Sequence, residues 1–158
     1  MKSLRILVFG LVCILFILTA GLLNGTATAR EKTAEADHRD TQQLERGQMI
    51  YNKFCAACHG ENLEGQADWR KRKPDGKLPA PPHDETGHTW HHPDDVLFGI
   101  TKHGLVPPNA PANYESDMPA WSNTLKDSDI WAVLAYIKSH WPTKTQEMQA
   151  EINDRSNR

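Results

Sequence analysis

Two cysteines and a histidine form the stretch of this sequence most able to do chemistry. In "NKFCAACHGE", residues 52–61, Cys55 and Cys58 are three positions apart and His59 follows directly. A Cys-x-x-Cys pair can be half of a zinc site, a redox-active dithiol or the attachment point of a cofactor. A structural zinc site usually needs four ligands from two paired half-sites, and the sequence has no second cysteine pair. The dithiol and the cofactor tether remain.

The histidine behind the second cysteine favours the tether. Cys-x-x-Cys-His is the attachment signature of c-type haem, whose two vinyl groups each accept one thiol. A thioredoxin-like dithiol would instead follow a strand, whereas the residues before Cys55 have a helical pattern. The sequence therefore predicts one haem c bound through Cys55 and Cys58, with His59 as an axial ligand of the iron.

The element that must present this motif is a helix that begins after Asp40 and runs to Cys55. Asp40 is the expected N-cap, with Gln43 three residues on as the partner of a capping box. Gly47 lies one turn before Tyr51 on the same face, although helix interiors avoid glycine. Either a neighbouring backbone comes close there, or Gly47 is a tolerated exposed residue.

Two further helices are expected. The first starts near Pro93, has Asp94 and Asp95 in its first turn and stops at Gly104. The other starts near Asp127 or Ser128 and ends before Pro142. Apolar residues recur at helical spacing in both: Val96, Leu97, Phe98, Ile100, Ile130, Val133, Leu134, Tyr136 and Ile137. Since no segment alternates as a strand does, we predict an all-α domain of three main helices with long loops, and a haem that fills its core.

A methionine is the expected second axial ligand. Met118 lies in a loop between the second and third helices, and Pro119 stiffens the backbone behind it. Met49 lies on the first helix and Met148 in a polar tail, where neither is well placed. Thioether ligation favours ferrous iron and suits an electron carrier. The alternative is that Met118 is ordinary packing.

With these residues in place, the chain resembles a class I mono-haem cytochrome c over residues 43–142. The resemblance rests on Gly47, Tyr51, Cys55, Cys58, His59, Met118, Pro119 and "VLAYIK" at 133–138. It implies the cytochrome c fold, in which Gly47 and Tyr51 would meet Val133 and Tyr136 where the first and last helices cross. It also implies a proline carbonyl that orients the axial histidine, from Pro81 or Pro82. The insertion at residues 67–92 departs from the simplest members of the family.

The two ends of the chain differ from this domain. Lys2 and Arg5 precede an apolar run at 6–23, and Ala27 and Ala29 follow it, so residues 1–29 are expected to be a cleaved signal peptide or a retained signal anchor. Either kind of segment would export residues 30–158 to the periplasm or to the outer face of the cytoplasmic membrane. If residues 6–23 are kept, they would tether the protein to the inner membrane. Residues 30–42 are then a linker. Residues 143–158 are a polar tail or a short helix, with Met148 and Ile152 as its apolar pair.

The net charge of the chain limits the kinds of partner that we expect it to bind. Removing residues 1–29 leaves 16 basic and 20 acidic residues, a net charge of −4, which argues against nucleic-acid binding. A local basic run contains Arg70, Lys71, Arg72, Lys73 and, nearby, Lys77. It either docks an acidic redox partner or is solvated surface.

Histidines and tryptophans near the insertion leave further alternatives. The histidines His83, His88, His91, His92 and His103 could hold a metal, line the haem edge or lie on the surface. Trp90 and Trp121 could donate indole N–H groups to haem propionates or be ordinary buried residues.

These features predict a carrier of one electron between a redox donor protein and an acceptor protein, and not an enzyme. A second hypothesis is a cytochrome subunit of a larger oxidoreductase complex. A third leaves the iron five-coordinate, for peroxide or a diatomic gas, and would require that Met118 not bind it.

Overall fold

The computed structural model describes residues 35–158, so the expected signal or anchor at 1–29 lies outside the described part. The described residues form α2 (Thr41–Phe54), α3 (Ala56–His59), the 3-10 helix η1 (Thr89–His91), α4 (Asp94–His103), α5 (Asp127–Ser139) and α6 (Thr143–Ser156). This part of the chain contains no strand, and the prediction of an all-α domain is confirmed. None of its helices is long and apolar enough to cross a membrane.

The start of α2 agrees with the sequence in one respect and differs in another. Asp40 is the N-cap, and its carboxylate accepts from the backbone N–H groups of Gln42 and Gln43. The capping box is wrong, because the Gln43 side chain accepts from the N–H of Asp37 at 2.8 Å and donates to the carbonyl of Glu35 at 2.9 Å. The N–H of Asp40 instead donates to the carbonyl of Asp37. The segment expected as a linker therefore folds back onto α2 as far as the structure describes it.

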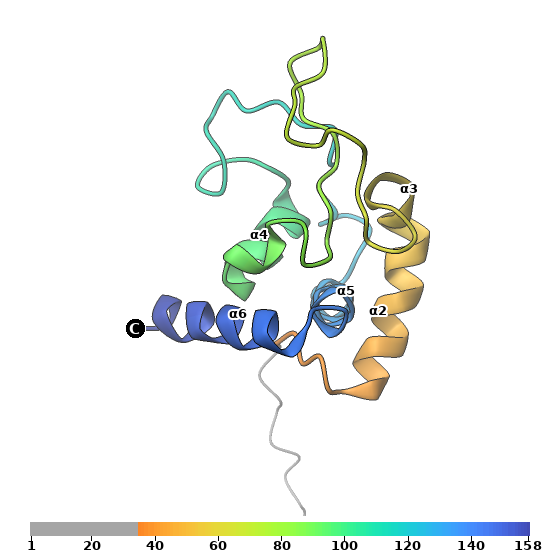
Figure 1. The fold of residues 1–158 in the computed structure, drawn as a ribbon, viewed down its shortest axis with the longest axis vertical. Helices are drawn as coiled ribbons and strands as arrows, with labels where there is room; N and C mark the ends of the chain where they lie inside the picture. Colours follow the sequence, from red (N-terminus) through yellow and green to blue (C-terminus); the bar gives the residue numbers. More distant parts are fainter. Residues whose placement is uncertain (1–34) are drawn as a thin grey trace, which may run out of the picture. The chain divides into compact units, whose positions relative to one another are not determined.

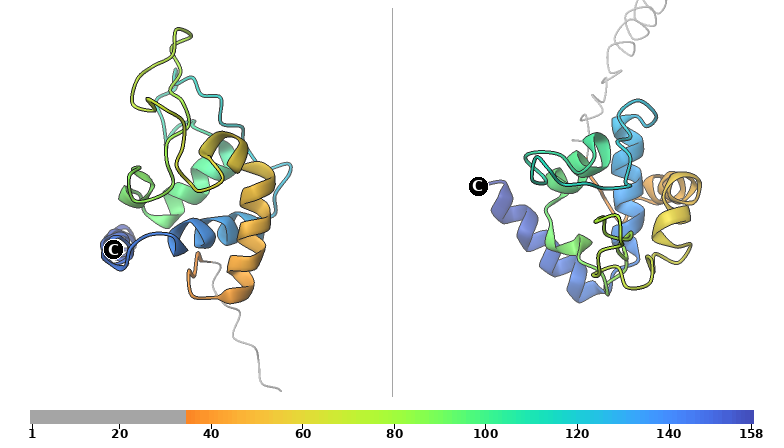
Figure 2. Two further views of the ribbon diagram at one scale, coloured as in Figure 1. Left: turned by 45° about the vertical axis from the view of Figure 1, so that its right-hand side comes forward. Right: turned by 90° about the horizontal axis from the view of Figure 1, so that it is seen from above.

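Helices α2 and α5 cross (Figures 1 and 2), and the crossing lies at Gly47, as the resemblance implied. A Cβ atom on Gly47 would lie 2.1 Å from the carbonyl oxygen of Ala132 and 2.7 Å from Cβ of Tyr136. Only glycine allows two backbones to approach so closely. One turn on, the Tyr51 ring lies 5.5 Å from that of Tyr136. The close crossing is confirmed, and the alternative of an exposed Gly47 is wrong.

Helix α5 supplies most of the core, and α4 packs against it. The buried residues fall into two clusters, and α5 contributes to both. The first contains Ala36, Leu97, Leu125, Ile130, Leu134 and Ala135. The second contains Tyr51, Leu63, Val133, Tyr136, Ile137 and Trp141. Pro93 precedes α4, and Gly104 ends it with a positive φ of 81°. The aromatic rings of Phe98 on α4 and Trp131 on α5 stack at 4.4 Å.

Residues 143–156 form the 14-residue helix α6, which packs through polar side chains. Gln149 is 1% exposed and donates to the carboxylate of Asp94 at 2.7 Å. Asn153 accepts from the N–H of Asp94 at 2.7 Å, and Lys138 pairs with the same carboxylate at 2.6 Å. Of the two apolar residues named for this segment, Met148 is 40% exposed. The side chain of Asp94 thus joins α4, α5 and α6.

Candidate cofactor site

The cysteine motif occupies a single turn at the end of α2. Cys55 is the C-cap of that helix, and its N–H still bonds to the carbonyl of Tyr51 at 2.8 Å. Residues 56–59 continue as α3, in which the N–H of His59 bonds to the carbonyl of Cys55 at 2.9 Å. Gly60, with φ of 83°, then ends the turn. One short helical segment therefore carries Cys55, Cys58 and His59, and the element that precedes it in the chain is the helix α2.

The chemistry of Cys55 argues against a redox dithiol. Burial, with the neighbouring Cys58 as a lesser cause, raises the pKa of the Cys55 thiol to about 12. Reactive dithiols have the opposite property, a thiol pKa lowered by a helix N-terminus or a nearby cation. Cys55 instead stays protonated at neutral pH, which leaves the cofactor tether as the better reading of the pair.

One ring nitrogen of His59 is engaged in a hydrogen bond that holds the side chain in place. The side chain is 8% exposed, and its Nδ1 lies 2.9 Å from the carbonyl oxygen of Pro81. Because a carbonyl can only accept, Nδ1 carries the proton and Nε2 keeps its lone pair for a metal. Burial lowers the pKa of His59 and outweighs the opposing effect of the bond to Pro81, so the imidazole is neutral at pH 7. Of the two prolines left open by the sequence, the structure selects Pro81.

Backbone packing holds this proline segment in place. The N–H of Gly65 bonds to the carbonyl of His59 at 2.7 Å, and a Cβ on Gly65 would lie 2.4 Å from the nitrogen of Pro82. A Cβ on Gly87 would lie 2.1 Å from the carbonyl oxygen of Pro82. Both glycines therefore pack closely against this segment, and main-chain contacts set the position of the Pro81 carbonyl.

Met118 lies, as expected, in the loop between α4 and α5. Its side chain is partly buried, and its N–H donates to Oγ of Ser116 at 3.0 Å. The preceding residue, Asp117, accepts from Nζ of Lys73 at 2.6 Å and Nζ of Lys77 at 2.5 Å. Hydrogen bonds from these two lysines hold the pKa of Asp117 at about 2. Residues 73–77 of the insertion are therefore joined to the methionine loop at the residue before Met118. Figure 2 shows these two loops on the same side of α4 and α5.

Most of the basic run has partners within the chain. Besides the two lysines on Asp117, the guanidinium of Arg70 lies 3.9 Å from the ring centre of Trp69. Arg72 donates to the carbonyl of Gly76 at 2.6 Å. Four of the five basic side chains thus contact the protein itself, and docking of an acidic partner stays a prediction.

The histidines near the insertion make several separate contacts with aromatic rings. His88 stacks on Trp69, with ring centres 5.3 Å apart, and meets the edge of His92 at 5.7 Å. His91 contacts Trp90 at 3.8 Å. Among residues 35–158, no group of three or more histidine, cysteine or acidic side chains is placed to hold a metal ion.

The two tryptophans also have partners in the chain. The indole N–H of Trp90 donates to the carbonyl of Glu85 at 3.2 Å, and a bond from either tryptophan to a haem propionate stays a prediction. Trp121 packs against Phe54, with ring centres 5.2 Å apart.

Sequence reasoning treated His83 as one member of this histidine group and missed its special position. Its ring stacks on that of His59, with centres 3.9 Å apart and planes 19° from parallel. Desolvation, with His59 as a further cause, lowers the pKa of His83 well below its ordinary value. The available signal was its place two residues after Pro81, in the segment expected to orient the axial histidine.

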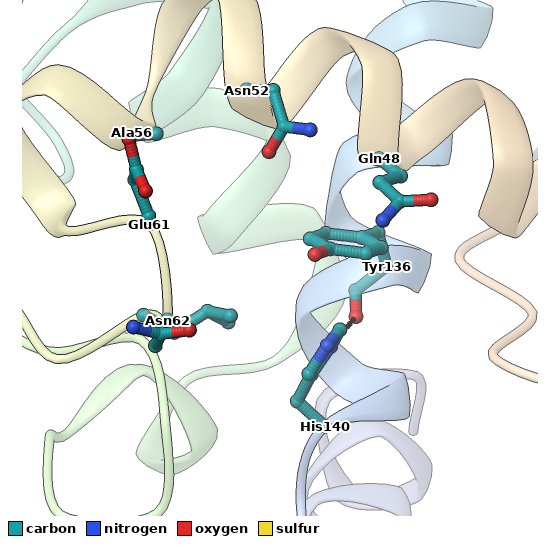
Figure 3. A pocket seen from close by; sticks show the side chains of 8 residues that line it. Gln48, Asn52, Ala56, Glu61, Asn62, Tyr136 and His140 are labelled. Carbon is teal, nitrogen blue, oxygen red and sulfur yellow. Dashed lines mark hydrogen bonds between the residues drawn. The ribbon is translucent and has the colours of Figure 1, made fainter.

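A cavity of about 580 Å³ lies elsewhere, between α2, α5 and the turn after α3 (Figure 3). Its walls are mostly polar: Gln48, Asn52, Ala56, Glu61, Asn62, Leu63, Tyr136 and His140. Since Cys55, Cys58, His59 and Met118 do not line it, this cavity is separate from the candidate cofactor site.

Comparison with known proteins agrees with the site. Residues 44–141 match the family model described as Cytochrome c, and the expected cytochrome c fold is confirmed. The chain is 35% identical over 100 residues to the Cbb3-type cytochrome c oxidase subunit CcoP of Azospirillum brasilense, a match that covers 62% of this chain and 28% of that protein. It is 32% identical over 98 residues to the thiosulfate dehydrogenase of Stutzerimonas stutzeri (strain A1501), covering 61% of this chain and 27% of the relative. The match thus spans about a quarter of either relative.

Proposed function

Because the chain belongs to the cytochrome c family, we propose that it is an exported one-electron carrier with a single His/Met-ligated haem c. The observation that carries this proposal is His59, which follows Cys55 and Cys58 on one turn and has its Nδ1 bonded to Pro81. A neutral imidazole with a free Nε2 lone pair is the form that binds iron. When bound, haem c supplies an iron centre that takes up and releases one electron.

Each residue of the site has a separate task in this proposal. Cys55 and Cys58 form the two thioethers and so fix the cofactor beside α3. His59 is one axial ligand, held in direction by the Pro81 carbonyl. Met118 is the other, and its thioether raises the potential by favouring ferrous iron. With both axial positions taken by protein atoms, no position is left for substrate, which is why we propose a carrier and not an enzyme.

The test compares three methionines. The matured wild type should give the ferrous spectrum of a low-spin haem that carbon monoxide does not change, and the ferric form should show the weak near-infrared band of sulfur ligation. Met118→Ala should lose that band and bind carbon monoxide. Met49→Ala and Met148→Ala are matched controls, since these side chains are 64% and 40% exposed, and both should behave as the wild type.

Two results would overturn the proposal. A wild type whose haem is removed by acid-acetone extraction would contradict covalent attachment. A wild type that binds carbon monoxide readily would contradict Met118 as a ligand and support the five-coordinate hypothesis of a peroxidase or gas sensor.

A second candidate function is an electron-transfer subunit of a larger oxidoreductase complex. Supporting it, the two relatives are an oxidase subunit and a dehydrogenase, each far longer than the matched region. Native mass of the solubilised protein and affinity capture from membranes separate the two. A monomer captured alone favours the carrier, and a stable stoichiometric complex favours the subunit.

Export is tested on the mature protein. Haem c attachment in a host that matures it outside the cytoplasm, together with recovery in the periplasmic or the membrane fraction, would support export. The intact mass then decides between cleavage after Ala29 and retention of residues 6–23 as a tether. A haem-free protein recovered only from the cytoplasm would contradict export.

A further inference from the structure

His83 and Pro81 act on the same imidazole from one short segment. Pro81 accepts the Nδ1 proton of His59, and two residues later the ring of His83 lies parallel to that of His59 within 19°. The hydrogen bond sets the direction of one ring atom but leaves the ring able to tilt about that bond. A planar neighbour at a centre distance of 3.9 Å opposes this tilt, because the two faces would separate or collide.

His83 is itself anchored at three atoms. Its N–H donates to the carbonyl of Leu63 at 2.7 Å, and its carbonyl accepts from the indole N–H of Trp141 at 2.8 Å. Its ring Nδ1 lies 2.9 Å from Oγ1 of the buried Thr89. Leu63 and Trp141 both belong to the core cluster around Tyr51. The His83 ring is therefore fixed by the core and by η1, and is not a loosely packed side chain.

We propose that His83 is a positioning residue that sets the plane of the His59 ring, and that Thr89 in turn sets the plane of His83. The proposal rests on the proposed function, in which His59 binds the haem iron. A side chain without a flat face could fill the same space, but it would not define a plane. The hydrogen bond to Thr89 explains why the planar residue here is a histidine.

The readout is the orientation of the axial imidazole, measured on the oxidised, matured protein. The spread of the haem-methyl proton resonances depends on the plane of the axial imidazole, and electron paramagnetic resonance g-values respond to the same property. His83→Leu should alter this spread. His83→Phe keeps a flat face and should retain most of the wild-type spread of the haem-methyl resonances. Thr89→Val should change this spread in the same direction as His83→Leu, but by less. His140→Leu is the matched control, since His140 contacts Tyr136 on α5, and its spectrum should be that of the wild type.

The outcomes separate this inference from the proposed function. If the wild type carries no covalent haem, the proposed function fails. If the wild type is a normal low-spin cytochrome and His83→Leu leaves the methyl spread unchanged, only the role of His83 fails. If His83→Leu does not mature, Thr89→Val decides, because it retains the stacked ring, and an unchanged spread in that variant overturns the proposal.

Discussion

The helix crossing and the loops around the cofactor site are held together by different means. Where α2 meets α5, contact is made by backbone against backbone at Gly47 and by buried apolar and aromatic residues. Away from Gly65 and Gly87, whose backbones pack tightly on Pro82, the loops at 60–88 and 105–126 depend on polar contacts, such as those of His59 with Pro81 and of Asp117 with two lysines. Because the crossing has no room to adjust, it should be far less tolerant of change than these polar contacts.

The largest effect is expected at Gly47. In Gly47→Ala the added methyl group would overlap the carbonyl of Ala132, and we expect a loss of about 3 kcal/mol in the free energy of unfolding. Gly99→Ala is the matched control on α4, where the nearest atoms to the new Cβ belong to the movable Asn109 side chain. It should change stability by about 1 kcal/mol or less. Denaturant unfolding followed by circular dichroism measures both, and equal effects would contradict the close crossing.

The next largest effect concerns the polar attachment of α6. Asp94→Ala leaves the ammonium of Lys138, 8% exposed, without its carboxylate, and should cost about 3 kcal/mol of unfolding free energy. Asp95→Ala removes the same charge from the same helix turn at an exposed position, and should cost about 1 kcal/mol or less. The double variant Asp94→Leu with Lys138→Met should recover much of the loss. If the two alanine variants are equally stable, the buried pair does not stabilise α6.

A smaller effect is expected from the contact between the loops. Asp117→Asn weakens its bonds to Lys73 and Lys77, so backbone amides of residues 105–125 should exchange hydrogen faster while global stability changes little. Glu115→Gln, in the same loop, is the control. Because exposed ion pairs are screened, the difference between Asp117→Asn and the wild type should shrink at high salt. A difference that salt leaves unchanged would contradict an ionic contact.

The smallest effect is a pH dependence at His92. Burial, and secondly the nearby His91, lower the pKa of His92 in the folded protein. The unfolded chain therefore binds a proton more readily, so the contribution of His92 to stability is present above about pH 6.5 and is lost as the pH falls below it. His92→Gln should lose less stability than the wild type between neutral and mildly acidic pH. His103→Gln, at the exposed end of α4, serves as the control, and identical pH profiles for all three proteins would contradict the prediction.

The same contrast explains what the sequence could predict. Helical spacing and end signals located α2, α4 and α5, because Asp40 and Gly104 cap their own helices and Pro142 closely follows the C-cap of α5. The haem motif was readable since its residues are adjacent in the chain. The packing of α6 could not be predicted, because Gln149 and Asn153 are polar and look like surface residues in the sequence. Only the fold brings Asp94, paired with Lys138, into contact with them. The stacking of His83 on His59 likewise depends on a loop path that local patterns do not encode.

The first part of the insertion, between Gln66 and Ala80, offers a practical opening. The N–H of Gln66 bonds to the carbonyl of Ala80 at 2.9 Å, and the N–H of Ala80 bonds to the Gln66 side chain at 3.0 Å. The chain thus departs and returns at one point, just before Pro81. Residues around the exposed turn at Gly76 could then accept a grafted peptide or a surface linker without displacing the Pro81 carbonyl. Such a graft would allow the protein to be wired to an electrode in a chosen orientation.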